Sequence, residues 1–150
     1  MHSLLTGLLA GALSGALMGL FSHILFRVGL FHSSLIIIDG SFFFRVLKRQ
    51  PSSAIISGAG LGIHLLTSAL FGGFYMAGAA FLGLDPVVVR SFIPISIYTG
   101  FLWLSMLFMA LPIAGQGVLG RKSSPYSWLE QLILHGIFAV TYYLSLGLFS

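Results

Sequence analysis

The chain has 150 residues, of which 57% are hydrophobic and only 7% are charged. Soluble domains carry about 25% charged residues, so this composition excludes an ordinary water-soluble globular protein. The absence of cysteine also excludes disulfides, iron–sulfur clusters and cysteine-bound zinc.

Apolar stretches long enough to cross a bilayer as helices recur along the chain, since about 20 residues suffice. Little sequence remains between them for a soluble domain. We therefore predict an all-α protein, a four-transmembrane-helix bundle in which residues 1–150 form a single integral membrane domain. The first stretch is too long for a secretory signal and is interpreted as a retained helix. The predicted spans are residues 4–30, 54–84, 91–119 and 127–149.

The first stretch carries a row of glycines at four-residue spacing, which would weaken a helix in water. In a bilayer the same row lets a second helix approach closely. We expect this row to pack against the second span or against a second subunit. Its members are Gly7, Gly11, Gly15 and Gly19, and the row continues into His23 and Arg27.

Residues 31–53 form the first loop, which contains a basic and aromatic segment. Arg45, Lys48 and Arg49 share one helical face there. The segment predicts a short amphipathic helix in the membrane interface, with Asp39 or Ser41 as its N-terminal cap. Its expected role is anchoring to lipid, and the alternative is a docking surface for a partner subunit.

The positive-inside rule places the first and third loops in the cytoplasm, because they hold most of the basic residues. Both termini would then face outward. Within the third span, Pro112 is expected to kink the helix, because proline removes one backbone hydrogen bond.

Histidines on three predicted spans lie about 10–15 Å from the cytoplasmic ends of their helices, at about 1.5 Å per residue. They are His23, His64 and His135. Small residues flank them at four-residue spacing, as in the row Gly60, His64, Ser68 and Gly72, so we expect all three to point into the bundle. Four polar residues lie in or just outside this layer: Arg27, Glu130, Gln131 and Gln116.

Several interpretations of this layer stay open. Neutral histidines can simply lock the bundle through hydrogen bonds. His64 and His135 are candidate ligands of haem b, and all three histidines are candidates for a metal site, with Glu130 as the nearby carboxylate. Histidines with Glu130 and Arg27 can also relay protons or ions, and these two charges are a candidate ion pair.

Three short apolar motifs resemble a loose group of small, uncharacterised bacterial four-helix inner-membrane proteins. They are His64-Leu65-Leu66 with Phe71-Gly72-Gly73, Gly100-Phe101-Leu102-Trp103 with Leu111-Pro112, and Leu134-His135-Gly136. The resemblance covers about residues 60–140 and implies a bundle in the bacterial inner membrane. It implies no activity. The four-helix multidrug transporters are less similar, because the first span here has no carboxylate.

Enzyme motifs such as a P-loop, GxSxG or HExxH are absent, which favours a non-enzymatic role. We expect an accessory or assembly subunit of a larger membrane complex. The alternatives are a redox subunit that binds haem b, with or without a quinone, and a small proton-coupled transporter or channel. The expected partners are the lipid bilayer and either other membrane subunits or further copies of the chain, and not nucleic acid.

Overall fold

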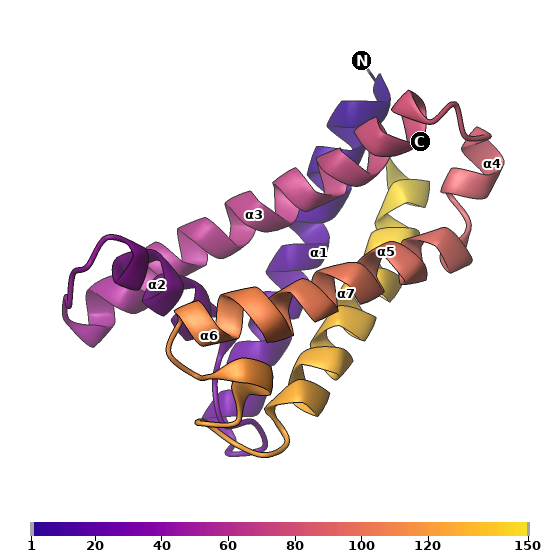
Figure 1. Ribbon diagram of the computed structural model, residues 1–150. Helices are drawn as coiled ribbons and strands as arrows, with labels where there is room; N and C mark the ends of the chain where they lie inside the picture. The colour runs from indigo at the N-terminus through magenta and orange to yellow at the C-terminus, as the bar shows by residue number, and fades with distance from the viewer. Residues whose placement is uncertain (1, 150) are drawn as a thin grey trace.

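A computed structural model describes residues 2–149, and every regular element in that range is helical (Figure 1). This confirms the predicted all-helical class, and four helical segments are long and apolar enough to make this a multi-pass membrane protein. They are α1 (His2–Arg27), α3 (Ser53–Phe81), the run from α5 (Phe92–Ser105) through α6 (Leu111–Ile113), and α7 (Ser127–Leu148).

Glycine and aspartate set the ends of the first two long helices. Gly29 follows α1 with a φ of +78°, and Gly83 follows α3 with a φ of +63°, as expected of residues that close a helix in a left-handed conformation. Asp85 then caps the short helix α4 (Pro86–Val89), because its Oδ1 accepts a hydrogen bond from the Val87 N–H at 2.7 Å.

The third span is shorter than predicted and contains a wide turn. A π-helical segment, η1 (Met106–Ala110), separates α5 from α6, and the helix ends at Ile113 rather than near residue 119. Pro112 has no N–H to donate to the Phe108 carbonyl, which explains why the regular pattern fails here. Gly115, with a φ of +89°, then starts the turn toward η2 (Val118–Gly120).

The helix in the first loop is also displaced from its predicted position. We expected it to begin near residue 41, but α2 spans Leu35–Val46. Ser34 occupies the N-cap position without a side-chain capping bond, so neither Asp39 nor Ser41 caps the helix. Asp39 instead lies in its second turn, within the apolar run that starts at Leu35.

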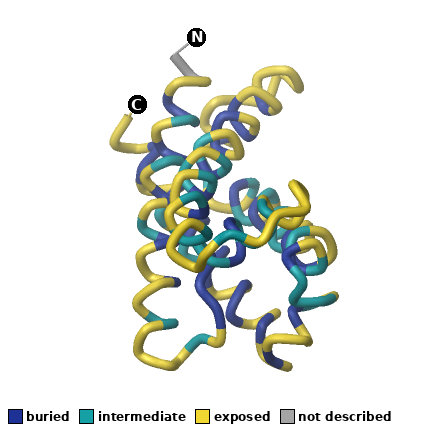
Figure 2. The backbone as a smooth tube through the Cα atoms, turned by 90° about the vertical axis from the view of Figure 1, so that its left-hand side faces the viewer, coloured by how far each residue is buried: buried dark blue, intermediate teal, exposed yellow. Residues whose placement is uncertain are grey.

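The four long helices form two crossed pairs, with α1 packed on α3 and α5 packed on α7 (Figure 1). The contact between α1 and α7 joins the pairs and is more extensive than that between α5 and α7. Helix α2 packs on α3 and also reaches α6. The two chain ends lie together, where Thr6 donates a hydrogen bond to the Phe149 carbonyl at 3.2 Å. Buried segments follow the inner faces of the helices (Figure 2). This arrangement leaves α3 and the α5–α6 run as two facing walls.

Candidate functional site

The glycine row of α1 lies directly against α3 and brings the two backbones together. A Cβ built at Gly7 would lie 2.5 Å from the Gly72 carbonyl oxygen, and one at Gly11 would lie 3.0 Å from the Gly72 Cα. Further along the same row, a Cβ at Gly15 would overlap the Ser68 side chain. The row therefore packs within one chain, against a row of α3 residues that includes His64.

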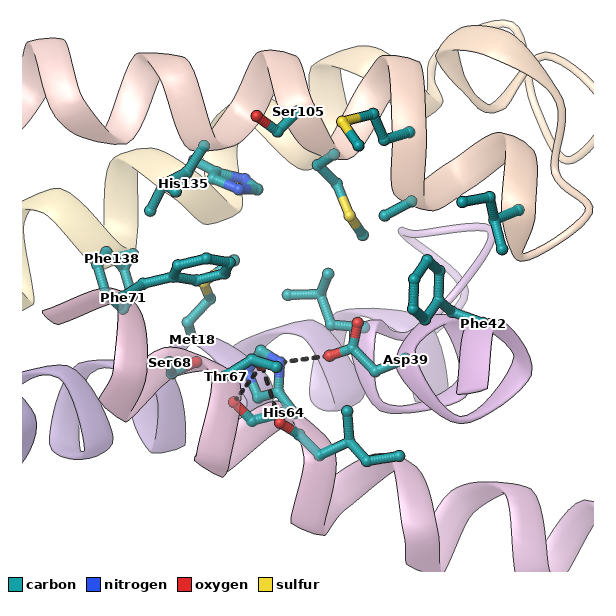
Figure 3. Close-up of a pocket in the computed structure, with 17 residues that line it drawn as sticks. Met18, Asp39, Phe42, His64, Thr67, Ser68, Phe71, Ser105, His135 and Phe138 are labelled. Carbon is teal, nitrogen blue, oxygen red and sulfur yellow. Dashed lines mark hydrogen bonds and ion pairs between the residues drawn. The ribbon is translucent and has the colours of Figure 1, made fainter. Parts of the chain in front are cut away.

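His64 faces this row, and both of its ring nitrogens have partners. A Cβ at Gly19 would lie 2.9 Å from the His64 ring, so glycine is needed there to admit the imidazole. His64 Nε2 lies 3.0 Å from the Gly15 carbonyl oxygen, and Nδ1 lies 2.7 Å from Oδ2 of Asp39 (Figure 3). The His64 side chain is 6% exposed and that of Asp39 is 19% exposed, so the pair is largely removed from water.

These contacts fix the number of protons that the pair holds. A carbonyl oxygen can only accept, so His64 Nε2 must carry a proton. The contact between Nδ1 and the Asp39 carboxyl is a hydrogen bond only if one more proton sits on either atom. The pair is therefore neutral as a unit, as an imidazolium with a carboxylate or as an imidazole with a carboxylic acid. The pair therefore holds one proton more than a neutral imidazole and a carboxylate hold when they are apart.

A second close glycine contact holds Asp39 in place. A Cβ at Gly60 would overlap the Ile36 carbonyl oxygen, and one at Gly40 would overlap the Ile56 carbonyl oxygen. The α2 and α3 backbones therefore nearly touch one turn before His64. Because Asp39 directly precedes Gly40, this contact sets the carboxylate beside the imidazole.

The pair forms part of the wall of a cavity of about 330 Å³ that lies between α3 and the α5–α6 run. Its other walls are mostly apolar, with methionines from η1 and phenylalanines from α2, α3 and α7 (Figure 3). The wide η1 turn contributes directly to this surface, as such turns often do at functional sites. The most informative lining residues are Asp39, His64, His135, Phe42, Met106 and Met109.

His135 enters the same cavity from α7, so two of the three predicted histidines share one site. Its Nδ1 donates to the Gln131 carbonyl at 2.8 Å, and the residue is only 9% exposed. An imidazole that donates from Nδ1 and is buried without a second partner is neutral, because a buried unpaired charge is costly. No described residue donates to Nε2, so this nitrogen presents a lone pair.

The expectation for His23 is wrong, because this residue is exposed rather than turned into the protein. A row at four-residue spacing turns by about 40° per step on a helix of about 3.6 residues per turn, so it leaves its partner after a few turns. Beyond His64, Gly60 of α3 packs on α2 instead of α1. Arg27 continues the same row and is also exposed.

The polar residues at the edge of the layer form a separate cluster around Glu130. Glu130 is 5% exposed, and its Oε1 lies 2.6 Å from Nδ1 of His32. Both carboxylate oxygens also accept from the His32 backbone N–H at 3.2–3.3 Å. Glu130 therefore pairs with His32 and not with Arg27. Gln131 is buried beside it, and neither Gln131 nor Gln116 has a hydrogen-bond partner for its buried Oε1 among the described residues.

The haem and metal interpretations do not fit this geometry. A histidine ligates iron through a nitrogen lone pair, but both nitrogens of His64 are engaged in hydrogen bonds, one of them inside the α1–α3 contact. Of the two described histidines that line the cavity, only His135 has an open nitrogen. In the described part of the chain, no three histidine or acidic side chains are grouped to hold a metal ion.

Neither Asp39, which pairs with His64, nor His32, which pairs with Glu130, was predicted from the sequence as a site residue. A signal for Asp39 was present, since it is the one charge between Ser34 and Phe44 in an otherwise apolar run. Comparisons of the chain with protein families, with curated proteins and with solved structures found no match. The resemblance to small bacterial inner-membrane proteins stays a prediction.

Proposed function

We propose that this protein is a small proton-coupled membrane carrier that binds a largely apolar molecule in the cavity between α3 and the α5–α6 run. The observation that carries this proposal is the Asp39–His64 pair, which holds one proton at the wall of that cavity. Ionisable groups inside a membrane are costly and usually serve binding or proton transfer. A pair that served only to pack α2 against α3 would not need to line a cavity.

The crossed arrangement also favours a carrier. Each wall is fastened to its own partner helix, α3 to α1 and α5 to α7, while few contacts join the walls directly. One such contact is the hydrogen bond from the Tyr98 hydroxyl to the Phe71 carbonyl at 2.8 Å. Movement of the α5–α6 run away from α3 would therefore open the cavity without breaking the glycine contacts between α1 and α3.

We further propose a location and an orientation for the carrier. Arg45, Lys48 and Arg49 at the end of α2, with Arg121 and Lys122 before α7, would face the cytoplasm by the positive-inside rule. In that orientation α2 would lie near the cytoplasmic interface of a bacterial inner membrane, and both termini would lie outside. The proton gradient across such a membrane would be the driving force.

Uptake into liposomes tests the carrier directly. Three probes of similar size are compared, 2-phenylethanol, 2-phenylethylamine and phenylacetate, with an imposed pH gradient. We expect at least one to enter protein-containing vesicles faster than empty ones, and we expect Asp39→Asn to abolish the difference. Asp85→Asn is the matched control, because asparagine keeps the cap of α4 and residue 85 is outside the cavity. Equal entry of all three probes into both kinds of vesicle would refute the proposal.

A second candidate is an accessory or assembly subunit of a larger membrane complex. It is favoured by the uneven burial of the helices, since 17% of the most apolar window of α3 is buried against 44% for α1 and α7. The exposed part of α3 would then contact partner helices instead of lipid. The mass of the particle extracted in mild detergent distinguishes the two, because a carrier needs no other subunit.

A further inference from the structure

We infer that the molecule bound in the cavity is a lipophilic amine in its ammonium form, which exchanges one for one with the proton of the Asp39–His64 pair. This inference rests on the proposed function and names its substrate class. It follows from which polar atoms the cavity leaves available, from its apolar walls and from the charge of the pair.

Apart from the Ser68 hydroxyl, the polar atoms that the cavity offers are hydrogen-bond acceptors. Oδ2 of Asp39 is bonded to His64, while the second carboxylate oxygen points into the cavity (Figure 3). From the opposite side, His135 presents the lone pair of Nε2, because its Nδ1 already donates to the Gln131 carbonyl. A ligand with two or more N–H donors fits these two acceptors.

Among the described residues that line the cavity, the Ser68 hydroxyl has no acceptor, and the other donors are already used. Both ring nitrogens of His64 are engaged, Nδ1 with Asp39 and Nε2 with the Gly15 carbonyl, and the shared proton lies between the two side chains. The hydroxyls of Thr67 and Ser105 donate to carbonyls of their own helices. No lysine or arginine lines the cavity. An anionic ligand would thus find an unpaired carboxylate oxygen and no cationic donor, so its burial would be unfavourable.

The remaining walls suit the apolar body of such an amine. Phe42, Phe71 and Phe138 surround the cavity from three different helices (Figure 3). Aromatic faces attract an ammonium group, and methionine side chains adapt to varied apolar shapes. The methionine side chains that line the cavity are Met18, Met106 and Met109.

The exchange balances in charge and in hydrogen bonds. The Asp39–His64 pair with its shared proton is neutral in both of its forms. When an ammonium ion binds, the shared proton leaves to water from whichever of Nδ1 and the Asp39 carboxyl holds it, and the freed lone pair of Nδ1 accepts an N–H of the ligand. Nε2 keeps its proton and its bond to the Gly15 carbonyl. The site again has no net charge, and no covalent bond of the ligand changes.

The pH dependence follows from the same proton. The titratable residues that line the cavity are Asp39 from α2, His64 from α3 and His135 from α7, whereas α1 and the α5–α6 run contribute none. Because protons compete with the amine, the affinity should fall about tenfold for each unit of decreasing pH while the pair holds its proton.

Calorimetry of the full chain in detergent tests the inference. We expect 2-phenylethylamine to bind at least tenfold more tightly than 2-phenylethanol, and phenylacetate not to bind. Titration in two buffers of different ionisation enthalpy should report the release of about one proton per amine. In Asp39→Asn the proton release should disappear, although the fold persists because the asparagine amide can donate to a neutral His64.

The outcomes separate the inference from the proposed function. Tighter binding of the alcohol or the carboxylate, or amine binding without proton release, overturns the substrate class while leaving a ligand cavity in place. Absence of binding by all three probes overturns both. Unchanged proton release in Asp39→Asn also overturns the inference, and Asp85→Asn should behave as the unmodified protein.

Discussion

At the scale of single residues, the hydrogen bonds of His64 determine its chemistry. The imidazole lies between a backbone carbonyl and a carboxylate, so it has no open lone pair and cannot serve as a metal ligand without breaking one contact. His135 is the opposite case, a neutral acceptor with one open nitrogen. Both residues are histidines at similar positions in apolar helices, and only their neighbours distinguish a proton-holding group from an acceptor.

The shared proton should be visible by spectroscopy. We expect ¹⁵N NMR of the labelled protein to show two protonated nitrogens on His64 and one on His135. If the proton resides on Asp39 instead, an infrared band of a buried carboxylic acid should replace the imidazolium signal. Asp39→Asn should leave His64 with one protonated nitrogen and no acid band. A spectrum with neither signature in the unmodified protein would contradict the proton count.

Glu130 should contribute to stability through His32 and not through Arg27. Glu130→Gln keeps an oxygen that accepts from the His32 N–H but removes the charge from a buried hydrogen bond, so we expect a loss of about 1–3 kcal/mol in the free energy of unfolding. Arg27→Gln is the matched control, because the exposed Arg27 should contribute less than about 0.5 kcal/mol. Equal losses in denaturant titrations of the two variants would restore the Glu130–Arg27 pair.

At the scale of helices, the sequence predicted the spans well and their partners less well. Apolar length alone is enough to define a membrane-spanning helix, which is why three spans end within about three residues of their predicted limits. The position of Asp39 depends instead on the contact between Gly40 and Gly60, twenty residues apart. No local pattern encodes that contact, so the carboxylate of the site could not be paired with His64 in advance.

The glycine row gives a sharp test of the α1–α3 contact. Gly11→Ala would place a methyl group against the Ser68 carbonyl and the Gly72 Cα, so backbones must separate. We expect a loss of about 1–3 kcal/mol in the free energy of unfolding. Gly62→Ala adds the same methyl group to α3 where nothing lies within 4 Å, and should cost nothing. Equal stability of the two variants in a denaturant titration would show that α1 and α3 are not closely packed.

At the scale of the whole molecule, the cavity arises from how the helix pairs cross. Helix α1 packs on both α3 and α7, α5 packs on α7, and α2 reaches both α3 and α6 and carries Asp39. The sequence identified His64 and His135 as members of one layer, and they do share the cavity. It could not identify the cavity itself, because the angle between two pairs of helices is a property of the assembled chain and not of any single segment.

The orientation of the molecule is also a property of the whole chain, and the absence of cysteine makes it straightforward to measure. Lys48 and Lys122 belong to the loops that hold most of the basic residues, whereas Val87 lies in the short helix between α3 and α5 and is 80% exposed. Single cysteines at these positions should react differently with a membrane-impermeant maleimide in intact bacterial cells. We expect labelling at position 87 only, and labelling at positions 48 and 122 after the membrane is permeabilised. The reverse pattern would place the basic loops outside, and the proton of the Asp39–His64 pair would then exchange with the opposite side of the membrane.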